Sequence, residues 1–212
     1  MLSDHAAARA ALVRSLARAG IRDRRVLEAI GRVPRERFVP AELADDAYED
    51  RALPIAEGQT ISQPWVVARM TELLEIGPDH RVLELGTGSG YQAAVLAELA
   101  AEVVSAERHA PLAKSAAAVL ADLGYRNVRV VHEDASAGLA RWAPYDRILV
   151  TAATPSIDPV LAGQCAADGK IVAPVGDQDH QELVVRRADG TETRYGAVRF
   201  VPLLGRGGFQ PR

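Results

Sequence analysis

Three glycines at alternate positions are the residues of this chain whose spacing points most directly to chemistry. Gly86, Gly88 and Gly90 follow the short apolar run 82–85, and a helical pattern begins at Tyr91. Because glycine lacks a Cβ atom, the backbone can turn sharply there and approach a ligand closely. The first N–H groups of the following helix would favour an anionic group. The pattern therefore predicts a binding turn for a cofactor that carries a carboxylate or a phosphate.

The spacing of these glycines favours one class of cofactor. A dinucleotide-binding turn needs Gly-x-Gly-x-x-Gly, whereas the third glycine here comes one residue early and Tyr91 occupies the expected position. With an acidic residue before the first glycine, the run resembles motif I of the S-adenosylmethionine-dependent methyltransferases. Taken alone, a glycine-rich turn is about as often a structural loop, but its place between a strand and a helix favours a cofactor site. The residues expected to contact the cofactor here are Glu84, Gly86, Thr87, Gly88, Ser89 and Gly90.

Two further acidic residues lie where an adenosine group needs hydrogen-bond acceptors. Glu107 ends a predicted strand 21 residues after Gly86 (107 − 86 = 21), the spacing at which a carboxylate accepts both ribose hydroxyls. Asp134 follows the next predicted strand and could accept the adenine amino group, since adjacent parallel strands open onto one crevice. An isolated acidic residue at a strand end is more often a turn or helix cap. The spacing of Glu107 from the glycine turn favours the cofactor role for that residue. For Asp134, the role of a turn or helix cap remains an alternative.

Composition limits the class of protein. The chain has 212 residues, 48% of them hydrophobic, which is enough for one sizeable core. A net charge of -3 without Lys or Arg runs gives no electrostatic footprint for nucleic acid or an anionic membrane. Neither a membrane-spanning stretch nor a signal-peptide pattern is visible, so we expect a cytoplasmic protein, and a monomer. Cys165 is the only cysteine and the five histidines have no ligand spacing, so we expect no metal site.

The elements that position these residues begin with two short helices. Residues 4–19 show a helical apolar face, and a second helix follows that Asp23 caps and Gly31 ends. From 35 to 63 the pattern is irregular and predicts a cover that faces the substrate. A further helix is expected over 64–76.

From residue 81 onward, strand and helix patterns alternate. Strands are predicted at 81–85, 102–107, 128–132, 147–151 and 170–174, with helices at 91–100, 111–123 and 157–164. This alternation predicts an α/β fold with a doubly wound, mostly parallel sheet. Asp189-Gly190 between strand-like runs at 183–187 and 193–201 predicts an antiparallel hairpin, which brings the sheet to seven strands. We expect a single domain, with an N-terminal helical and cover segment (1–76), a cofactor-binding core (77–204) and a loose tail (205–212).

The segment before the glycine turn makes the resemblance specific. The runs Gly58–Pro64 and Val66–Met70 resemble the signature that precedes motif I in the protein-L-isoaspartate O-methyltransferases. Further similarities at 33–40, 145–153 and 198–203 extend the resemblance over nearly the whole chain. The resemblance implies a Rossmann-like methyltransferase fold. It also implies methyl transfer from S-adenosyl-L-methionine to the α-carboxylate of L-isoaspartyl residues in damaged proteins and peptides, which releases S-adenosyl-L-homocysteine and starts their repair.

The implied chemistry needs few catalytic groups. An α-carboxylate has a pKa of about 3.5 and is already ionised at neutral pH, so no general base is required. The resemblance implies that the Ser62 hydroxyl holds this carboxylate, that Thr60 and Ile61 shape the same loop, and that Val201 holds the substrate backbone extended. From local sequence, Ser62 could instead cap the helix that begins at Pro64, and Val201 could belong to core strand packing.

One segment departs from the family pattern, and three other functions stay open. Glu133–Gly138 replaces the Gly-Asp-Gly or Gly-Asp-Ala and Trp-Gln-Gly that family members commonly carry on the adenine side. A nucleic-acid or amine methyltransferase would share the fold, although 151–155 lacks the Asn/Asp-Pro-Pro-aromatic motif of that class. The remaining alternatives are a carboxyl methyltransferase acting on an aspartate of a dedicated precursor peptide, and a binding module without turnover.

Overall fold

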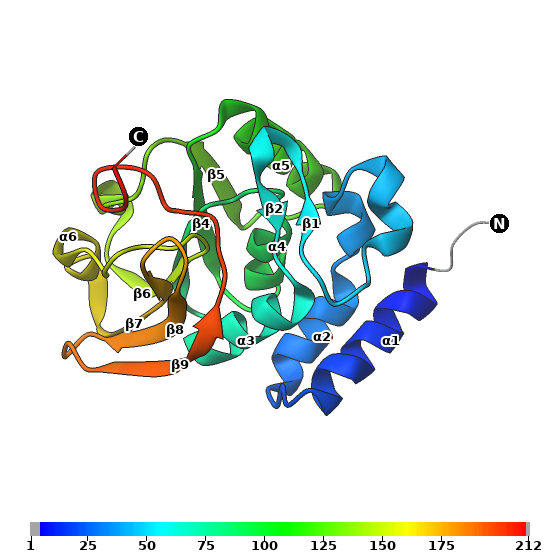
Figure 1. Cartoon of the computed structure of the whole chain (residues 1–212), viewed down its shortest axis with the longest axis horizontal. Coiled ribbons are helices and arrows are strands. Elements are labelled where there is room, and N and C mark those ends of the chain that lie inside the picture. The colour runs from blue at the N-terminus through cyan, green and yellow to red at the C-terminus, as the bar shows by residue number, and fades with distance from the viewer. Residues whose placement is uncertain (1–4, 211–212) are drawn as a thin grey trace.

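Two N-terminal helices precede the sheet and pack against each other (Figure 1). The structure, a computed structural model, describes residues 5–210. Helix α1 spans His5–Arg18 and α2 spans Arg24–Arg32, and the Asp23 side chain accepts the Arg25 N–H as the predicted cap. Gly31 does not end α2: it lies inside the helix, which stops after Arg32 because the backbone becomes extended at the next residue. The predicted start of the first helix at residue 4 lies outside the described residues.

The cover segment 35–63 is more ordered than its sequence pattern indicates. Its three 3-10 helices are η1 (Arg35–Phe38), η2 (Ala41–Asp46) and η3 (Ala56–Gly58), and its strands are β1 (Leu53–Pro54) and β2 (Thr60–Ile61). The two strands pair antiparallel as a small hairpin. Strands of two residues are too short to show a period-two pattern, so the sequence could not reveal them. Helix α3 (Pro64–Leu74) follows and ends where Glu75 adopts a left-handed conformation, with φ 51°.

The main sheet has seven strands in the order β5-β4-β3-β6-β7-β8-β9. Their bounds are Arg81–Leu85 (β3), Glu102–Glu107 (β4), Val128–His132 (β5), Tyr145–Val150 (β6), Cys165–Gly176 (β7), Gln181–Arg187 (β8) and Glu192–Val198 (β9). The first five strands in this order, β5 to β7, run parallel to one another, and β8 runs antiparallel to both β7 and β9. The predicted doubly wound, mostly parallel sheet with a C-terminal hairpin is confirmed.

The helices between the strands are shorter than or close to their predicted lengths. They are α4 (Tyr91–Ala97), α5 (Ala110–Asp122) and α6 (Pro159–Ala162), with a 3-10 turn η4 (Ala140–Trp142) before β6. Helix α6 has only four residues because Asp158 caps its first turn and the chain leaves the helix at Gly163. The region that was predicted as helical over 157–164 therefore contributes little more than a turn.

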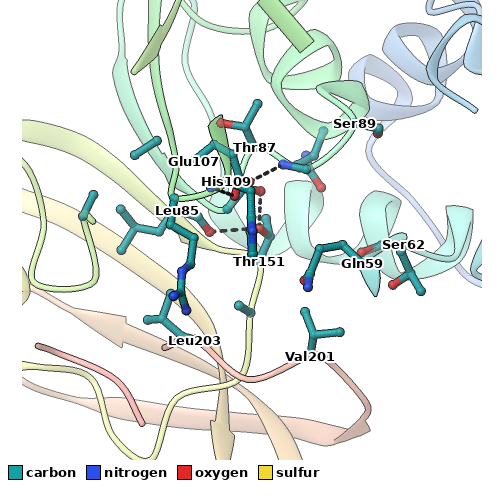
Figure 2. Close-up of a pocket in the computed structure, with 18 of the residues that line it drawn as sticks. Gln59, Ser62, Leu85, Thr87, Ser89, Glu107, His109, Thr151, Val201 and Leu203 are labelled. Atoms are coloured by element: carbon teal, nitrogen blue, oxygen red, sulfur yellow. Dashed lines mark hydrogen bonds between the residues drawn. The ribbon is translucent and has the colours of Figure 1, made fainter. Parts of the chain in front are cut away.

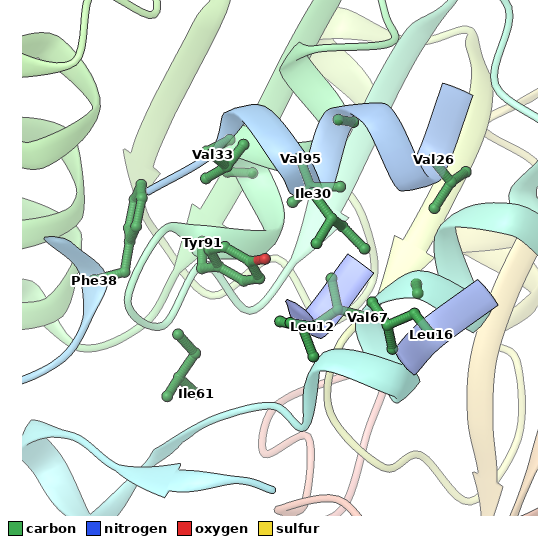
Figure 3. Close-up of a cluster of buried hydrophobic side chains, with 14 of the residues drawn as sticks. Leu12, Leu16, Val26, Ile30, Val33, Phe38, Ile61, Val67, Tyr91 and Val95 are labelled. Carbon is green, nitrogen blue, oxygen red and sulfur yellow. The ribbon is translucent and has the colours of Figure 1, made fainter. Parts of the chain in front are cut away.

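Alternation along the strands divides the core between the two faces of the sheet. On β3, Val82 packs in the cluster that contains Leu74 of α3 and Leu96 of α4, whereas Leu83 faces the cluster that contains Leu161 of α6. A third cluster joins the N-terminal helices to α3 and α4 (Figure 3). It includes Leu12, Leu16, Ile30, Val67, Tyr91 and Val95. The N-terminal segment thus shares buried surface with the sheet layer.

The C-terminal segment, red in Figure 1, returns from β9 across the sheet. Leu203 donates its N–H to Ala153 at 2.7 Å, and the Val201 carbonyl accepts the Ala153 N–H at 2.8 Å. The predicted loose tail is wrong for residues 205–209: the Phe209 N–H bonds to Leu203, and the Gly207 N–H reaches the Ser136 hydroxyl at 3.0 Å. Residues 211 and 212 lie outside the described part of the chain.

Candidate functional site

A cavity of about 280 Å³ lies at the carboxyl ends of β3, β4 and β6. The glycine turn after β3 and the segment after β4 form one side, and the residues around β2 together with 201–204 form the other (Figure 2). Carboxyl ends of parallel strands are where open α/β sheets bind ligands. The cavity brings together residues from six separate segments of the sequence, which are 58–67, 85–92, 106–109, 133–136, 151–152 and 201–204.

The glycine turn is shaped by close contacts as well as by its backbone angles. Gly86 has φ 101°, and a Cβ there would lie 2.5 Å from Thr151 Oγ1. The same Thr151 hydroxyl lies 2.6 Å from the Gly86 carbonyl oxygen and 2.9 Å from that of Leu85. Gly88 has φ 54°, and the nearest atom to a Cβ there is 3.8 Å away, so the backbone is open to the cavity. Gly90 faces Ala116 of α5 instead and does not line the cavity.

The N–H groups of the turn are largely used within the protein. Gly86 and Thr87 both donate to the Ala106 carbonyl, at 2.8 and 3.1 Å, and Gly90 donates to Thr87 at 2.8 Å. Gly88 donates to the Glu107 carboxylate at 2.9 Å. These bonds involve the turn itself, and the expectation that the first N–H groups of the following helix favour an anion stays a prediction. Hydrogen bonds hold the turn against β4. What the turn offers a ligand is a backbone that it can approach closely at Gly88 and Ser89.

Glu107 is held in place at the wall of the cavity. Its side chain is 5% exposed, one oxygen accepts the Gly88 N–H and the other accepts the His109 N–H at 2.9 Å. Each carboxylate oxygen has two lone pairs, so both retain one for a further donor. The fixed carboxylate therefore suits a ligand with two neighbouring hydroxyl groups.

Glu84 lies beneath the turn, not in the cavity. It is 0% exposed and pairs in register with Ser105 of β4, whose hydroxyl donates to Glu84 Oε2. The Ser105 oxygen is also 2.6 Å from Thr87 Oγ1, so a hydrogen-bonded chain supports the turn from below. Burial raises the pKa of the Glu84 carboxyl to about 8, against the lowering effect of the Ser105 hydrogen bond. Glu84 supports the turn and cannot contact a ligand directly.

Asp134 lines the cavity on the side that departs from the family pattern. Its Oδ1 accepts the Ser136 N–H at 3.0 Å, as in the cap alternative that the sequence left open. Burial works to raise the pKa of Asp134, but hydrogen bonds from Ser136 and the Arg206 backbone outweigh it and lower that pKa. The tail turn 205–209 thus packs on the segment whose sequence differs.

The residues expected on the substrate side all line the cavity. Thr60 is exposed, Ser62 is half-buried, and Ile61 is 3% exposed with its side chain in the N-terminal core cluster. Val201 also lines the cavity, whereas its neighbours Val198 and Phe200 pack against a core cluster. Core packing therefore explains the neighbours of Val201 but not Val201 itself.

The helix-cap alternative for Ser62 does not match the structure. Gln63 is the N-cap residue of α3 and makes no side-chain cap hydrogen bond. Instead, Asp50 accepts the Trp65 N–H at 2.8 Å and caps the helix from outside its own sequence neighbourhood. The Ser62 hydroxyl forms no hydrogen bond to any residue in the described range, so it is available to a ligand.

The cavity lining also includes residues that were not among the predicted site residues, several of them polar. Gln59, His109 and Thr151 line the cavity in Figure 2. His109 Nδ1 lies 3.7 Å from Glu57 Oε2, and this contact joins α5 to the hairpin of the cover. Tertiary contacts bring these three residues to the cavity, so local sequence patterns did not identify them. Thr151 is an exception, because it ends a predicted strand and could have been recognised as a site residue from that position.

Residues 5–210 contain neither a metal-binding cluster nor a helix that could span a membrane. No group of three or more His, Cys, Asp or Glu side chains with a metal-binding arrangement occurs in that range. None of the helices described is long and apolar enough to cross a membrane. Cys165 is half-buried, and burial raises the pKa of its thiol to about 11, which makes it a poor nucleophile.

Comparison with known proteins gives consistent matches over most of the chain. The family model described as protein-L-isoaspartate(D-aspartate) O-methyltransferase (PCMT) matches residues 7–208. The protein-L-isoaspartate O-methyltransferase of Koribacter versatilis (strain Ellin345) is 52% identical over 195 residues, 91% of this chain and 88% of that protein. That of Protochlamydia amoebophila (strain UWE25) is 50% identical over 202 residues, 93% of this chain and 96% of that protein.

Two solved structures share the fold. A protein-L-isoaspartate O-methyltransferase superposes with a TM-score of 0.83 at 27% identity, covering 94% of this chain and 66% of that chain. A putative protein-L-isoaspartate O-methyltransferase from Plasmodium falciparum, in complex with S-adenosyl-L-homocysteine, has a TM-score of 0.78 at 23% identity. The superposition covers 91% of this chain and 96% of the Plasmodium falciparum chain. At 23% identity, the similarity concerns the fold alone.

Proposed function

The chain belongs to the protein-L-isoaspartate(D-aspartate) O-methyltransferase family. From this membership we propose that it methylates the α-carboxylate of L-isoaspartyl residues in damaged proteins and peptides. The methyl donor is S-adenosyl-L-methionine. The observation that carries the proposal is one cavity with two different sides. The free Ser62 hydroxyl and Val201 lie on one side, and Glu107 with the glycine turn lies on the other.

The residues of the second side fit an adenosine cofactor. Glu107, whose two oxygens are fixed by backbone N–H groups, would hold the ribose hydroxyls, and the open space over Gly88 would admit the cofactor against the backbone. Thr87 and Ser89 line the adjoining wall, and Asp134 lies on the adenine side. When bound, S-adenosyl-L-methionine supplies an electrophilic methyl group on sulfur and leaves as S-adenosyl-L-homocysteine.

On the substrate side, the protein orients a nucleophile that is already charged. Ser62 donates a hydrogen bond to the isoaspartyl carboxylate and fixes its direction, and Thr60 and Ile61 form strand β2, which Ser62 directly follows. Val201 supports an extended substrate backbone from the opposite segment. Orientation and exclusion of water from the carboxylate supply the rate enhancement, so no proton needs to be removed from the substrate.

The product then reacts without the enzyme. A methyl ester has a better leaving group than a carboxylate, so the following backbone nitrogen attacks it, methanol leaves and a succinimide forms. Hydrolysis of that ring returns part of the material to normal aspartate. Flexible segments are the expected substrates, because an isoaspartyl linkage adds a methylene to the backbone and fits poorly in regular structure.

A pair of synthetic peptides tests the proposal. The purified protein is incubated with radiolabelled S-adenosyl-L-methionine and with peptides that differ only in an isoaspartyl or a normal aspartyl residue. Base-labile label on the isoaspartyl peptide alone is the expected result. Label on neither peptide, with the cofactor bound, would instead support the dedicated precursor peptide or the binding module without turnover.

The proposal extends to the state and location of the protein. We expect a monomer in the cytoplasm that acts on isoaspartyl-containing proteins and peptides and has no nucleic-acid partner. Sedimentation velocity over a range of protein concentrations tests the monomer. A concentration-dependent increase in sedimentation coefficient would contradict it.

A further inference from the structure

Arg35 is a fully buried arginine that lies behind the wall of the cavity. It is 0% exposed. Its Nε donates to the Ala47 carbonyl and its Nη2 donates to the Ser62 carbonyl, both at 2.8 Å. Its guanidinium carbon lies 4.7 Å from the centre of the Tyr91 ring. All three partners are uncharged.

Burying the Arg35 guanidinium among uncharged partners costs folding free energy that an apolar side chain at this position would not cost. A buried charge is expensive unless it is paired, and replacing such a group by apolar side chains is often neutral or stabilising. The Nη1 of Arg35 and the hydroxyl of Tyr91 are both buried without a hydrogen bond of good geometry to any described residue. The position therefore retains contacts that packing alone does not require.

The partners of Arg35 belong to the two sides of the cavity. Ser62 follows β2 on the substrate side, and Tyr91 is the first residue of α4, directly after the glycine turn. Tyr91 is itself fixed, because it is 1% exposed and its ring meets that of Phe38 edge to face at 5.7 Å. Arg35 thus connects a rigid aromatic at the cofactor turn to the main chain of Ser62.

We propose that Arg35 is a positioning residue, which holds the Ser62 carbonyl relative to the Tyr91 ring and so fixes where the Ser62 hydroxyl points. This inference rests on the proposed function, since it assumes that Ser62 orients the substrate carboxylate. Arg35 does not line the cavity, so it acts through Ser62 and not on the substrate. The third donor group, Nη1, is not needed for this role.

The variant Arg35→Lys tests the inference. Lysine keeps the charge, but its single nitrogen lacks the planar fork that reaches two carbonyls while stacking on a ring. Misplacement of a reacting group by about 1 Å can cost roughly a hundredfold in rate, so we expect kcat on the isoaspartyl peptide to fall by about ten- to a hundredfold. The dissociation constant of S-adenosyl-L-homocysteine, measured by calorimetry, should stay within about twofold, because Arg35 does not itself line the cavity and Phe38 still packs against the Tyr91 ring.

Arg37→Lys is the matched control. Arg37 lies in the same 3-10 helix, but its guanidinium is exposed and pairs with Asp122 on α5. Exposed ion pairs contribute little, so this variant should keep wild-type kinetics. Hydrogen exchange provides a readout without turnover: amides of residues 60–63 should exchange faster in Arg35→Lys, whereas those of β3 and β4 should not change.

A second variant separates positioning from folding. Arg35→Ala leaves a cavity of guanidinium shape, and millimolar guanidinium, below denaturing concentrations, should restore part of kcat. The inference is overturned if Arg35→Lys matches wild type in kcat and in exchange at 60–63. It is equally overturned if kcat, cofactor affinity and melting temperature all fall together and exchange accelerates throughout the chain. Failure of wild-type turnover on the isoaspartyl peptide would count against the proposed function, whereas the exchange comparison still tests the Arg35 contact.

Discussion

Ser62 offers the cavity a hydroxyl that the fold does not use elsewhere. Helix α3 takes its cap from Asp50, so removing the Ser62 hydroxyl should leave the helix intact. A hydrogen bond to a charged group contributes about 1.5–3 kcal/mol, and Ser62→Ala should therefore lower kcat/KM for the isoaspartyl peptide by about ten- to a hundredfold. Steady-state kinetics measure this loss, and calorimetry with S-adenosyl-L-homocysteine should show nearly unchanged affinity.

The matched control for Ser62→Ala is Ser115→Ala, which makes the same change at an exposed position of α5. This control should keep wild-type activity. An equal loss of cofactor binding and of methyl transfer in Ser62→Ala would contradict the role assigned to the hydroxyl.

Glu84 makes stability depend on pH. Because burial raises its pKa to about 8, the folded protein keeps the carboxyl protonated over a pH range in which the unfolded chain ionises it. Its contribution is fully present below the unfolded pKa, of about 4.3, and is lost as pH rises through about 8. Glu84→Gln stays neutral, so its free energy of unfolding should rise relative to wild type between pH 5 and pH 8, by roughly 3 kcal/mol. Urea unfolding at these two pH values measures the difference, and a pH-independent difference would contradict a buried neutral acid.

The sequence identified residues whose position depends on spacing, and it failed where position depends on packing. Glu107 was found because strand length and the glycine turn set its distance from Gly86. Glu84 was expected to contact the cofactor, but its side chain points to Ser105 inside the protein. Arg35 gave no local signal, since its partners are 12 or more residues away in the chain.

At the scale of elements, the strands of the parallel sheet were predicted best. The bounds of β3, β4 and β5 agree with the predicted ranges, because short apolar runs there end at glycines or charged residues. The hairpin β1–β2 was missed because two-residue strands are defined by their pairing and not by a local pattern. The ordered tail was missed because its hydrogen bonds reach Ser136, 71 residues away.

The tail turn 205–209 should support the adenine side of the cavity. A Cβ at Gly205, where φ is 147°, would collide with Asp134 Oδ1 and Ser136 Oγ, so Gly205→Ala should displace the turn from the segment that it covers. We expect S-adenosyl-L-homocysteine to bind about tenfold more weakly, equivalent to about 1.4 kcal/mol. Isothermal titration calorimetry measures the change.

Gly196→Ala provides the control for backbone strain. Gly196 also has a positive φ, 98°, but a Cβ there meets nothing within 4 Å, and the residue lies in β9 outside the cavity lining. Both variants should lose stability through strain, of about 1 kcal/mol. If both weaken cofactor binding equally, the tail does not support the cavity.

At the scale of the whole molecule, the cavity lies between parts that share one core. The N-terminal cluster contains side chains from α1, α2, α3 and α4 together with Phe38, Leu53 and Ile61 of the cover segment, so the N-terminal helices, the cover and the helices on the cofactor-binding sheet are joined by buried apolar surface. Ion pairs also join these parts: Arg32 of α2 pairs with Glu98, and Arg37 of the cover pairs with Asp122. We therefore expect the cover and the sheet to unfold as one cooperative unit.

Differential scanning calorimetry with and without ligand tests whether the chain unfolds as one cooperative domain. The protein alone should show one transition, with equal calorimetric and van't Hoff enthalpies. S-adenosyl-L-homocysteine at a hundred times its dissociation constant stabilises the folded state by about 2.7 kcal/mol, which for a chain of this size raises Tm by about 5–10 °C. The whole transition should move, because the ligand binds only when Glu107 and the glycine turn are folded, and the cover unfolds with them. Two separate transitions, of which only one responds to the ligand, would show that residues 1–76 fold independently of the sheet.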